Sequence, residues 1–538
     1  MSVFLAISPV ILIFLLMTWG RRTADVAGLT GWVYTALLAG LYFHTSWQVI
    51  LVASLAGVVA SFPISLMVVT SIFQINVMEE AGAIRRLVVF MKTLASRNRA
   101  AQVMLINVGA GTLLAALGAT PVSILPPIML SLGYSAFVAI ALPALGYDAL
   151  CTYALLGVPV VVFADVAKGI TGREFTPAEV GLYFAQYMPV ITSLIALAML
   201  WLVGGWAEVR RGWPVALTTG LTAGFIAIGM NVAGLPTLTG IVAGIGVVLV
   251  MLAYLRLSGQ RLIDRELLGE EDRRAERAMG LGLAVLPWIL LVVFSFVTNF
   301  GRFGVYDVLF TQLAMPVEIV PGRPERLRAL WQAYTWVLIA TLVAIPFYRM
   351  AAGRLAAAGR KTLRRAPRPA FAAAVYFAVA FVLNHSGKAP ALVADKLAWT
   401  PNPDGGLNMV KVVADASAGV FHGAYAGVAA FLGLLGGFIS GSETSSIAML
   451  SKLHFETAAQ VYTGVTPERL LAISLLVAAV SGIGGGLASV ISPAKLQNAA
   501  AVIDKIGMES QVIRATAVIA LIMTLAAAAL TFVFLARI

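Results

Sequence analysis

The chain has 538 residues, of which 60% are hydrophobic and only 12% are charged, and its mean hydropathy is +0.92. A soluble globular protein needs a polar surface that this composition does not supply, so the surrounding solvent must be lipid. The formal net charge of +12 could suggest a nucleic-acid partner, but the charges lie between apolar runs, as in the loops of membrane proteins.

Apolar runs long enough to cross roughly 30 Å of hydrocarbon as helices recur along the chain. The first run, residues 3–19, has no small-residue cleavage site, and Arg21 and Arg22 follow it instead of preceding it. We therefore expect a retained first span and not a signal peptide. The single cysteine, Cys151, lies in an apolar stretch and says nothing about the redox compartment.

Basic segments separate the apolar runs and, by the positive-inside rule, share the cytoplasmic side. They lie at residues 21–22, 85–99, 210–211, 256–277 and 349–368. This arrangement predicts about twelve crossings of the plasma membrane with both termini outside. The expected crossings cover approximately residues 3–20, 26–44, 48–78, 136–161, 187–206, 213–231, 236–255, 280–300, 331–348, 370–391, 467–494 and 513–535.

The segments between the crossings carry weaker signals. Residues 81–99 have helical apolar spacing with basic residues opposite, which predicts a helix at the cytoplasmic interface. Residues 256–277 and 349–368 are expected to be solvated loops. The aromatic-bearing segment 301–330 is extracytoplasmic by this count, and the sequence assigns it no role.

Two apolar stretches, residues 102–132 and 413–453, do not fit as simple crossings, because either would move the next basic loop to the wrong side. The first is interrupted at residues 118–123, and the second at residues 441–446. Glycine, proline and clustered hydroxyls break helices, and free backbone groups at membrane depth need protein or a cavity beside them. Both stretches are therefore predicted to be re-entrant hairpins.

Each predicted hairpin precedes a crossing that is itself interrupted, near residues 145–148 in the first case and 481–486 in the second. The two units have opposite orientations, which is typical of the inverted repeats of secondary transporters. The expected organisation is an all-α membrane protein in which one bundle carries the site and the other is a scaffold. Its parts are two N-terminal helices (1–46), a first repeat (47–255), a charged cytoplasmic linker (256–279) and a second repeat (280–538).

At these breaks the sequence resembles the L-lactate permease family from about Trp47 to the C-terminus. Residues 441–446, G-S-E-T-S-S, resemble the family's G-S-D-T-S-S; residues 491–493 match its I-S-P, and residues 384–387, N-H-S-G, resemble its N-Y-S-G. Weaker matches are at residues 157–159 and 212–214. The resemblance implies proton-coupled carriage of lactate, glycolate and related 2-hydroxy monocarboxylates, by a fold with paired hairpins and elevator-like motion.

The chain also departs from the family pattern. The family's acidic E-G-A-A-G-F-G-A-P first hairpin corresponds here to residues 114–121, which contain no carboxylate. Asp148 and Lys388 are charged where the family tends to be neutral or apolar. One acid is lost, and an acid and a base are gained, so the coupling chemistry or the substrate of this divergent member has changed.

Two carboxylates are candidates for proton coupling, because an acid at bilayer depth is costly unless it is used or paired. Glu443 could bind the coupling proton, or it could simply cap a half-helix. Asp148 could share the proton relay, or it could form a structural pair with Lys388. Lys388 could attract the substrate carboxylate, or it could extend to the interface.

Hydroxyl and amide groups at the breaks suit a carboxylate and a 2-hydroxyl together, although serines also satisfy the backbone of broken helices. With Lys388, the predicted substrate-binding residues are Thr120, Ser123, Asn384, Ser386, Ser442, Thr444, Ser445, Ser446 and Ser492. Ser489 belongs to the same predicted group, and sodium coordination at these breaks stays open.

The sequence thus predicts a secondary transporter that moves one small 2-hydroxy monocarboxylate with one proton. The alternatives are a sodium-coupled or exchange transporter of another organic anion, a channel, or a membrane-embedded enzyme. The four histidines have no metal-ligand spacing, and neither a G-x-S-x-G nor a Walker motif occurs. We therefore expect no cofactor, no metal and no catalytic residues; membrane lipid is the surrounding partner, and a homodimer stays open.

Overall fold

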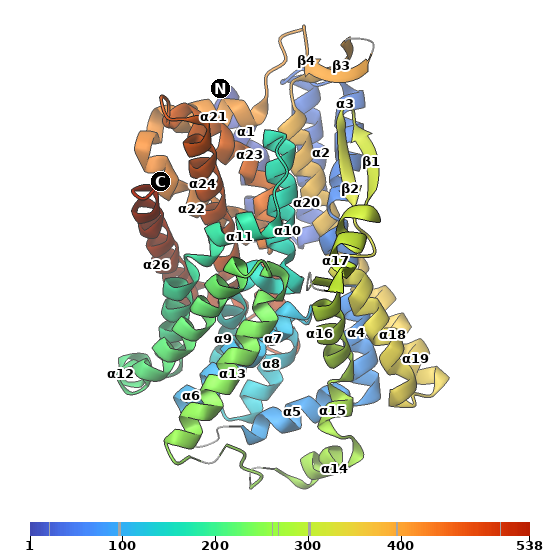
Figure 1. Cartoon of the computed structure of the whole chain (residues 1–538), viewed down its shortest axis with the longest axis vertical. Coiled ribbons are helices and arrows are strands. Elements are labelled where there is room, and N and C mark those ends of the chain that lie inside the picture. The colour runs from blue at the N-terminus through green and yellow to red at the C-terminus, as the bar shows by residue number, and fades with distance from the viewer. Residues whose placement is uncertain are drawn as a thin grey trace.

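A computed structural model describes the chain except residues 21, 95–97, 261, 267, 300–302, 394–395 and 506. It is mostly helical, and ten helical segments of the described part are long and apolar enough to cross a membrane (Figure 1). Shorter apolar helices cover the other predicted crossings. The prediction of an all-α integral membrane protein is confirmed, whereas Arg21 of the first basic segment lies outside the described residues.

The helices of the first half follow one another with short connections. They are α1 (Ser2–Thr18), α2 (Ala24–Leu41), α3 (Trp47–Ala60), α4 (Phe62–Ala81), α5 (Ala83–Thr93), α6 (Arg99–Val103), η1 (Met104–Ala110), α7 (Gly111–Ala116), α8 (Pro121–Ser131), α9 (Ala136–Asp148), η2 (Cys151–Tyr153), α10 (Ala154–Thr171), α11 (Pro177–Ala185), α12 (Met188–Val232), η3 (Pro236–Leu238) and α13 (Thr239–Leu257).

The second half adds two small antiparallel β-hairpins to the helices. Its elements are α14 (Glu270–Ala278), α15 (Leu281–Ala284), α16 (Leu286–Asn299), α17 (Val305–Asp307), η5 (Val308–Gln312), β1 (Met315–Val320), β2 (Arg323–Leu327), α18 (Ala333–Tyr348), α19 (Ala352–Arg365), α20 (Pro367–His385), β3 (Lys388–Val393), β4 (Lys396–Pro401), α21 (Met409–Phe421), η6 (His422–Ala424), α22 (Tyr425–Ser440), α23 (Glu443–Val461), α24 (Pro467–Leu487), η7 (Ser489–Ile491), α25 (Pro493–Ala501) and α26 (Glu509–Leu535).

The two ends of the molecule differ in charge and in structure. Helices α5, α14 and α19 and the bend of α12 lie at the lower end in Figure 1, and the β-hairpins and the N-terminus lie at the upper end. The predicted spans 187–206 and 213–231 are the two limbs of α12, which reverse direction at Gly205, where φ is +63°. The lower end carries most of the basic segments, so the positive-inside rule predicts that it faces the cytoplasm.

Three predictions about connecting segments need correction. The basic stretch 349–368 is not a loop but contains α19, whose Lys361 Nζ lies 2.6 Å from Glu80 Oε1 at the end of α4. The predicted span 370–391 ends earlier, because α20 stops at His385 and β3 begins at Lys388. The stretch 256–277 is not entirely a loop, because α14 begins at Glu270. The segment 301–330, to which the sequence assigned no role, contains the β1–β2 hairpin. The helix predicted within 81–99 is confirmed as α5.

The predicted breaks at residues 118–123 and 441–446 are confirmed. Helix α7 ends at Ala116 and α8 begins at Pro121, and Gly118 between them has φ +82°. Helix α22 ends at Ser440 and α23 begins at Glu443, and Gly441 has φ +67°. These left-handed glycines turn the chain where a residue with a Cβ would be strained.

The other two interruptions lie further along the chain than predicted. Helix α9 continues through Asp148. Beyond it the chain forms only the short 3₁₀ helix η2 before Leu155, Leu156 and Gly157 adopt left-handed conformations. Helix α24 continues through the glycines at 482–486, and its break falls at residues 488–492.

The glycines of α24 serve helix packing instead of breaking the helix. A Cβ at Gly484 would collide with the backbone of Ala430 in α22, and one at Gly485 would lie 2.9 Å from Ser446 Cβ in α23. Small residues of this kind let membrane helices approach closely. Helices α22, α23 and α24 therefore form one tightly packed group, against which α10 and α26 also pack.

Candidate functional site

The breaks after α9 and before α23 meet in the interior and bring a carboxylate to that junction. Glu443 is the first residue of α23, and its side chain is buried, with the residue 3% exposed. The Thr152 hydroxyl in η2 donates to Glu443 Oε1 at 2.6 Å, while Oε2 has no hydrogen-bond partner in the described part of the chain. A Cβ at Gly486 would lie 2.6 Å from Oε2, so α24 closes the site on that side.

The second carboxylate, Asp148, ends α9 and is 4% exposed. The backbone N–H of Val490 in η7 donates to Asp148 Oδ2 at 3.3 Å, and Oδ1 has no hydrogen-bond partner among the described residues. The alternative pairing with Lys388 is wrong, because Lys388 lies in β3 and its Nζ contacts His385 Nδ1 at 3.5 Å. Each half of the chain thus supplies one buried acid with one unpaired oxygen.

A cation at this junction escaped the sequence analysis. Lys495, in the first turn of α25, donates from Nζ to Ser489 Oγ at 2.6 Å and lies 3.8 Å from the centroid of the Tyr147 ring. Its positive charge acts on both Asp148 and Glu443. The sequence did hold a signal for this cation, because Lys495 follows the I-S-P motif by two residues. It was missed because the predicted span ended at residue 494, so Lys495 was placed outside the membrane segment. Thr152 and Tyr147 gave no signal of their own.

The predicted hydroxyl cluster divides into two kinds of residue. Ser442 caps α23 by accepting from Ser445 N at 3.3 Å, and Ser446 donates to the Gly433 carbonyl at 3.2 Å, so both have structural partners. Ser445 Oγ and Ser492 Oγ are buried without a partner in the described part, and a Cβ at Gly441 would lie 3.2 Å from Ser492 Oγ. The described residues therefore leave the hydrogen-bonding capacity of these two hydroxyls unused.

Thr444 and the first hairpin complete the junction. Thr444 is buried beside Glu443. Thr120 precedes α8 and is exposed, and Ser123 Oγ accepts from Asn498 Nδ2 at 2.9 Å. Since Asn498 follows Lys495 in α25, the tip of the first predicted hairpin contacts the same short helix as the cation.

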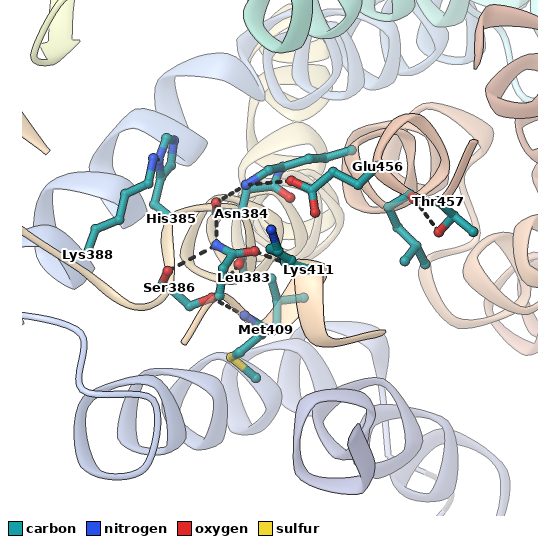
Figure 2. A network of polar contacts seen from close by, with 12 residues as sticks. Leu383, Asn384, His385, Ser386, Lys388, Met409, Lys411, Glu456 and Thr457 are labelled. Carbon is teal, nitrogen blue, oxygen red and sulfur yellow. Dashed lines mark hydrogen bonds and ion pairs between the residues drawn. The ribbon is translucent and has the colours of Figure 1, made fainter. Parts of the chain in front are cut away.

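The other predicted residues lie elsewhere, in a separate network at the outer end of α20 (Figure 2). Ser386 Oγ accepts from Met409 N at 2.7 Å, and Asn408 Nδ2 donates to the carbonyls of Asn384 and Ser386 at 3.1 and 3.0 Å. Lys452 Nζ also donates to the Asn384 carbonyl. Lys452 follows Glu443 by nine residues of α23, or about 13.5 Å of helix, so Asn384, Ser386 and Lys388 do not join the carboxylates.

The junction can bind a small anion and exchange a proton. A lysine and two unpaired hydroxyls provide donors for a carboxylate, and two buried acids provide acceptors for a proton. The described residues contain no group of three or more His, Cys, Asp or Glu side chains that could hold a metal ion.

Comparison with known proteins gives the same family along the whole chain. The family model described as L-lactate permease matches residues 2–538, which extends the resemblance beyond its predicted start at Trp47. A glycolate permease of Escherichia coli is 24% identical, over 96% of this chain and 92% of that protein. An L-lactate permease of Streptococcus iniae is 23% identical over 84% and 90%, and one of Bacillus subtilis is 22% identical over 99% and 95%.

Proposed function

Since the chain belongs to the L-lactate permease family and is a multi-pass plasma-membrane protein, we propose that it is a secondary active transporter of a small 2-hydroxy monocarboxylate such as lactate or glycolate. We propose further that a proton moves with the anion. The observation that carries the proposal is the pair of buried acids, Glu443 and Asp148, each with an unpaired oxygen, beside Lys495.

In this proposal each group at the junction has a distinct role. Lys495, Ser445 and Ser492 bind the carboxylate and the 2-hydroxyl, and Glu443 takes the coupling proton, with Asp148 sharing the relay. Thr444, Ser442, Ser446, Thr120 and Ser123 shape the site. One anion and one proton add no net charge, so transport avoids the cost of about 2.3 kcal/mol per 100 mV that a lone anion meets at a negative interior.

The broken helices support a pair of re-entrant hairpins in inverted repeats. In each half a helix–break–helix segment precedes an interrupted crossing: α7 and α8 precede α9–α10, and α22 and α23 precede α24–α25. We assign residues 47–255 and 280–538 to the two repeats, with residues 256–279 as the linker. An elevator-type motion would carry the junction past a scaffold built around α3, α4 and α20.

The main alternative is sodium-coupled or exchange transport of another organic anion. The absence of a carboxylate at residues 114–121, where the family's first hairpin is acidic, supports a changed substrate or coupling ion. A membrane-embedded enzyme is the competing class, and the permease names of the relatives support transport instead.

Uptake into proteoliposomes tests the proposal. Purified protein is expected to accumulate labelled lactate or glycolate only while an inward proton gradient is imposed, and to release it when the gradient is collapsed. Accumulation driven by a sodium gradient alone would show that the coupling ion is sodium and not a proton. Failure with both ions, together with uptake of a different organic anion, would contradict the monocarboxylate assignment.

The separate network around Ser386 gives a second prediction. Replacing Ser386 with Ala removes hydrogen bonds to Met409 N and to the Leu383 carbonyl, so stability should fall by about 1–2 kcal/mol. The KM for lactate should stay unchanged, because Ser386 does not reach the carboxylates. Thermal unfolding measures the stability, and the concentration dependence of uptake measures the KM. A raised KM at unchanged stability would show that Ser386 belongs to the binding site after all.

A further inference from the structure

A large cavity lies outside the junction, toward the end of the molecule opposite the basic cytoplasmic segments. Its volume is about 580 Å³, within the range of roughly 300–1,000 Å³ that small-molecule sites occupy. Its walls come from the α3–α4 connection, one face of α10, the outer half of α20, two positions of α23 and the chain around β2. None of these walls belongs to the breaks that hold Glu443 and Asp148.

The charged side chains that line this cavity are mostly cationic. Among the side chains that the structure describes, three lining residues are cationic, namely Lys168, Arg328 and Lys452. One lining residue, Asp165, carries a carboxylate. That carboxylate is already engaged, since Arg328 Nη1 donates to its two oxygens at 3.0 and 3.2 Å. Lys168 Nζ lies 2.6 Å from Glu174 Oε1, and Glu174 does not line the cavity. The lining therefore carries more cations than acids, although each of the three cations has a carboxylate partner.

Two of the cations are fixed in place by the protein. The Arg328 guanidinium lies 4.1 Å from the centroid of the Phe310 ring, and its Nε has no hydrogen-bond partner in the described part of the chain. Lys452 Nζ donates to the Asn384 carbonyl and lies 3.7 Å from Glu456 Oε1. An anion in the cavity would add a charge-assisted hydrogen bond to either of these two cations.

The inner end of the cavity adjoins the junction through an apolar cluster. Val162, Phe377 and Ala448 line the cavity and also pack with Ile64 and Val158. Ala448 follows Glu443 by five residues of α23, or about 7.5 Å along the helix. The cavity and the junction thus share α10 and α23, and apolar side chains separate them.

We propose that this cavity is an outer binding site for a small organic monocarboxylate, with Lys452 and Arg328 holding the carboxylate and the valine and phenylalanine side chains contacting the alkyl group. The chemical class of the ligand rests on the proposed function, whereas the existence of an anion site rests on the cavity and its charges. The site would hold the anion on the extracytoplasmic side of the apolar cluster.

Cysteine protection tests the outer site without relying on transport. Thr171 lines the cavity and is exposed, whereas the native Cys151 is buried. A Thr171→Cys variant should react with a membrane-impermeant thiol reagent, and lactate should slow that reaction. The wild-type chain measures any background from Cys151.

Charge variants in the Thr171→Cys background identify the ligand-holding cation. Lys452→Gln should raise the half-protecting lactate concentration at least about tenfold, the size of losing about 1.4 kcal/mol of binding, and Lys452→Arg should restore it. Lys411→Gln, which removes an exposed charge from α21 outside the cavity, is the matched control and should change nothing. The absence of protection by lactate, or equal protection with Lys452→Gln, would overturn the proposal.

The test separates this site from the proposed transport mechanism. In a Glu443→Gln variant the protection by lactate should persist, because Glu443 does not line the cavity. Protection that persists in Glu443→Gln while proton-driven uptake fails would support both the outer site and the proposed coupling. Wild-type protein that is protected by lactate but does not accumulate it would count against the proposed coupling only. Loss of protection in Glu443→Gln would place the bound lactate at the junction and contradict a separate site.

Discussion

Replacement of Glu443 by Gln is expected to abolish lactate accumulation driven by a proton gradient, while exchange of labelled for unlabelled lactate continues. The amide oxygen of Gln can still accept from the Thr152 hydroxyl at the position where Glu443 Oε1 now lies 2.6 Å away, so the junction should keep its shape. The amide cannot take up a proton, and any anion that still crosses does so alone. At an interior-negative potential of 100 mV such an anion would be excluded by about 2.3 kcal/mol, or roughly fifty-fold.

The measurement is uptake into proteoliposomes with the membrane potential clamped and the pH gradient varied independently. Glu468→Gln, an exposed acid in the first turn of α24, is the matched control and should retain full accumulation. Undiminished proton-driven accumulation by Glu443→Gln would remove this residue from the coupling mechanism. Loss of both accumulation and exchange, with normal thermal stability, would instead assign Glu443 to substrate binding.

Replacement of Lys495 by Gln is expected to give the largest loss of substrate affinity. In the proposed function its ammonium, whose charge acts on both junction carboxylates and which donates to Ser489 Oγ, binds the carboxylate of the substrate. A charge-assisted hydrogen bond contributes about 1.5–3 kcal/mol, so affinity should fall roughly tenfold to over a hundredfold.

The dependence of lactate exchange on lactate concentration measures this loss. Lys505→Gln, an exposed lysine that follows α25, serves as the control and should bind lactate normally. Lys495→Arg keeps the positive charge and should recover part of the affinity. Equal affinity in Lys495→Gln and the wild type would show that the substrate carboxylate is held elsewhere.

The sequence was most informative where one physical constraint dominated. Long apolar runs and the placement of basic residues determined the helices, because backbone groups in lipid must be satisfied within helices. Gly118 and Gly441 marked real breaks, since a left-handed turn requires glycine there. Glu443 was found because an acid inside an apolar run stands out.

The sequence was less informative where distant segments had to be brought together. The glycines at 482–486 have the composition of a break, and only their contact with α22 and α23 shows that they serve packing. Asn384 and Ser386 have the residue types of a binding site, yet their partners, Asn408 and Met409, satisfy a helix end. Lys495 lay just beyond an apolar run and was treated as its boundary.

The close packing of α24 on α22 and α23 has a mechanical consequence. Helices that touch backbone to backbone, as Gly484 does against Ala430, cannot slide past one another without a clash. In the proposed elevator-type motion these three helices would therefore travel as one stiff body, and Glu443 would travel with them. In that motion, displacement would fall at the apolar cluster where Ile64 and Phe377 meet Ala448, and it would also break the hydrogen bond from Lys452 Nζ in α23 to the Asn384 carbonyl in α20.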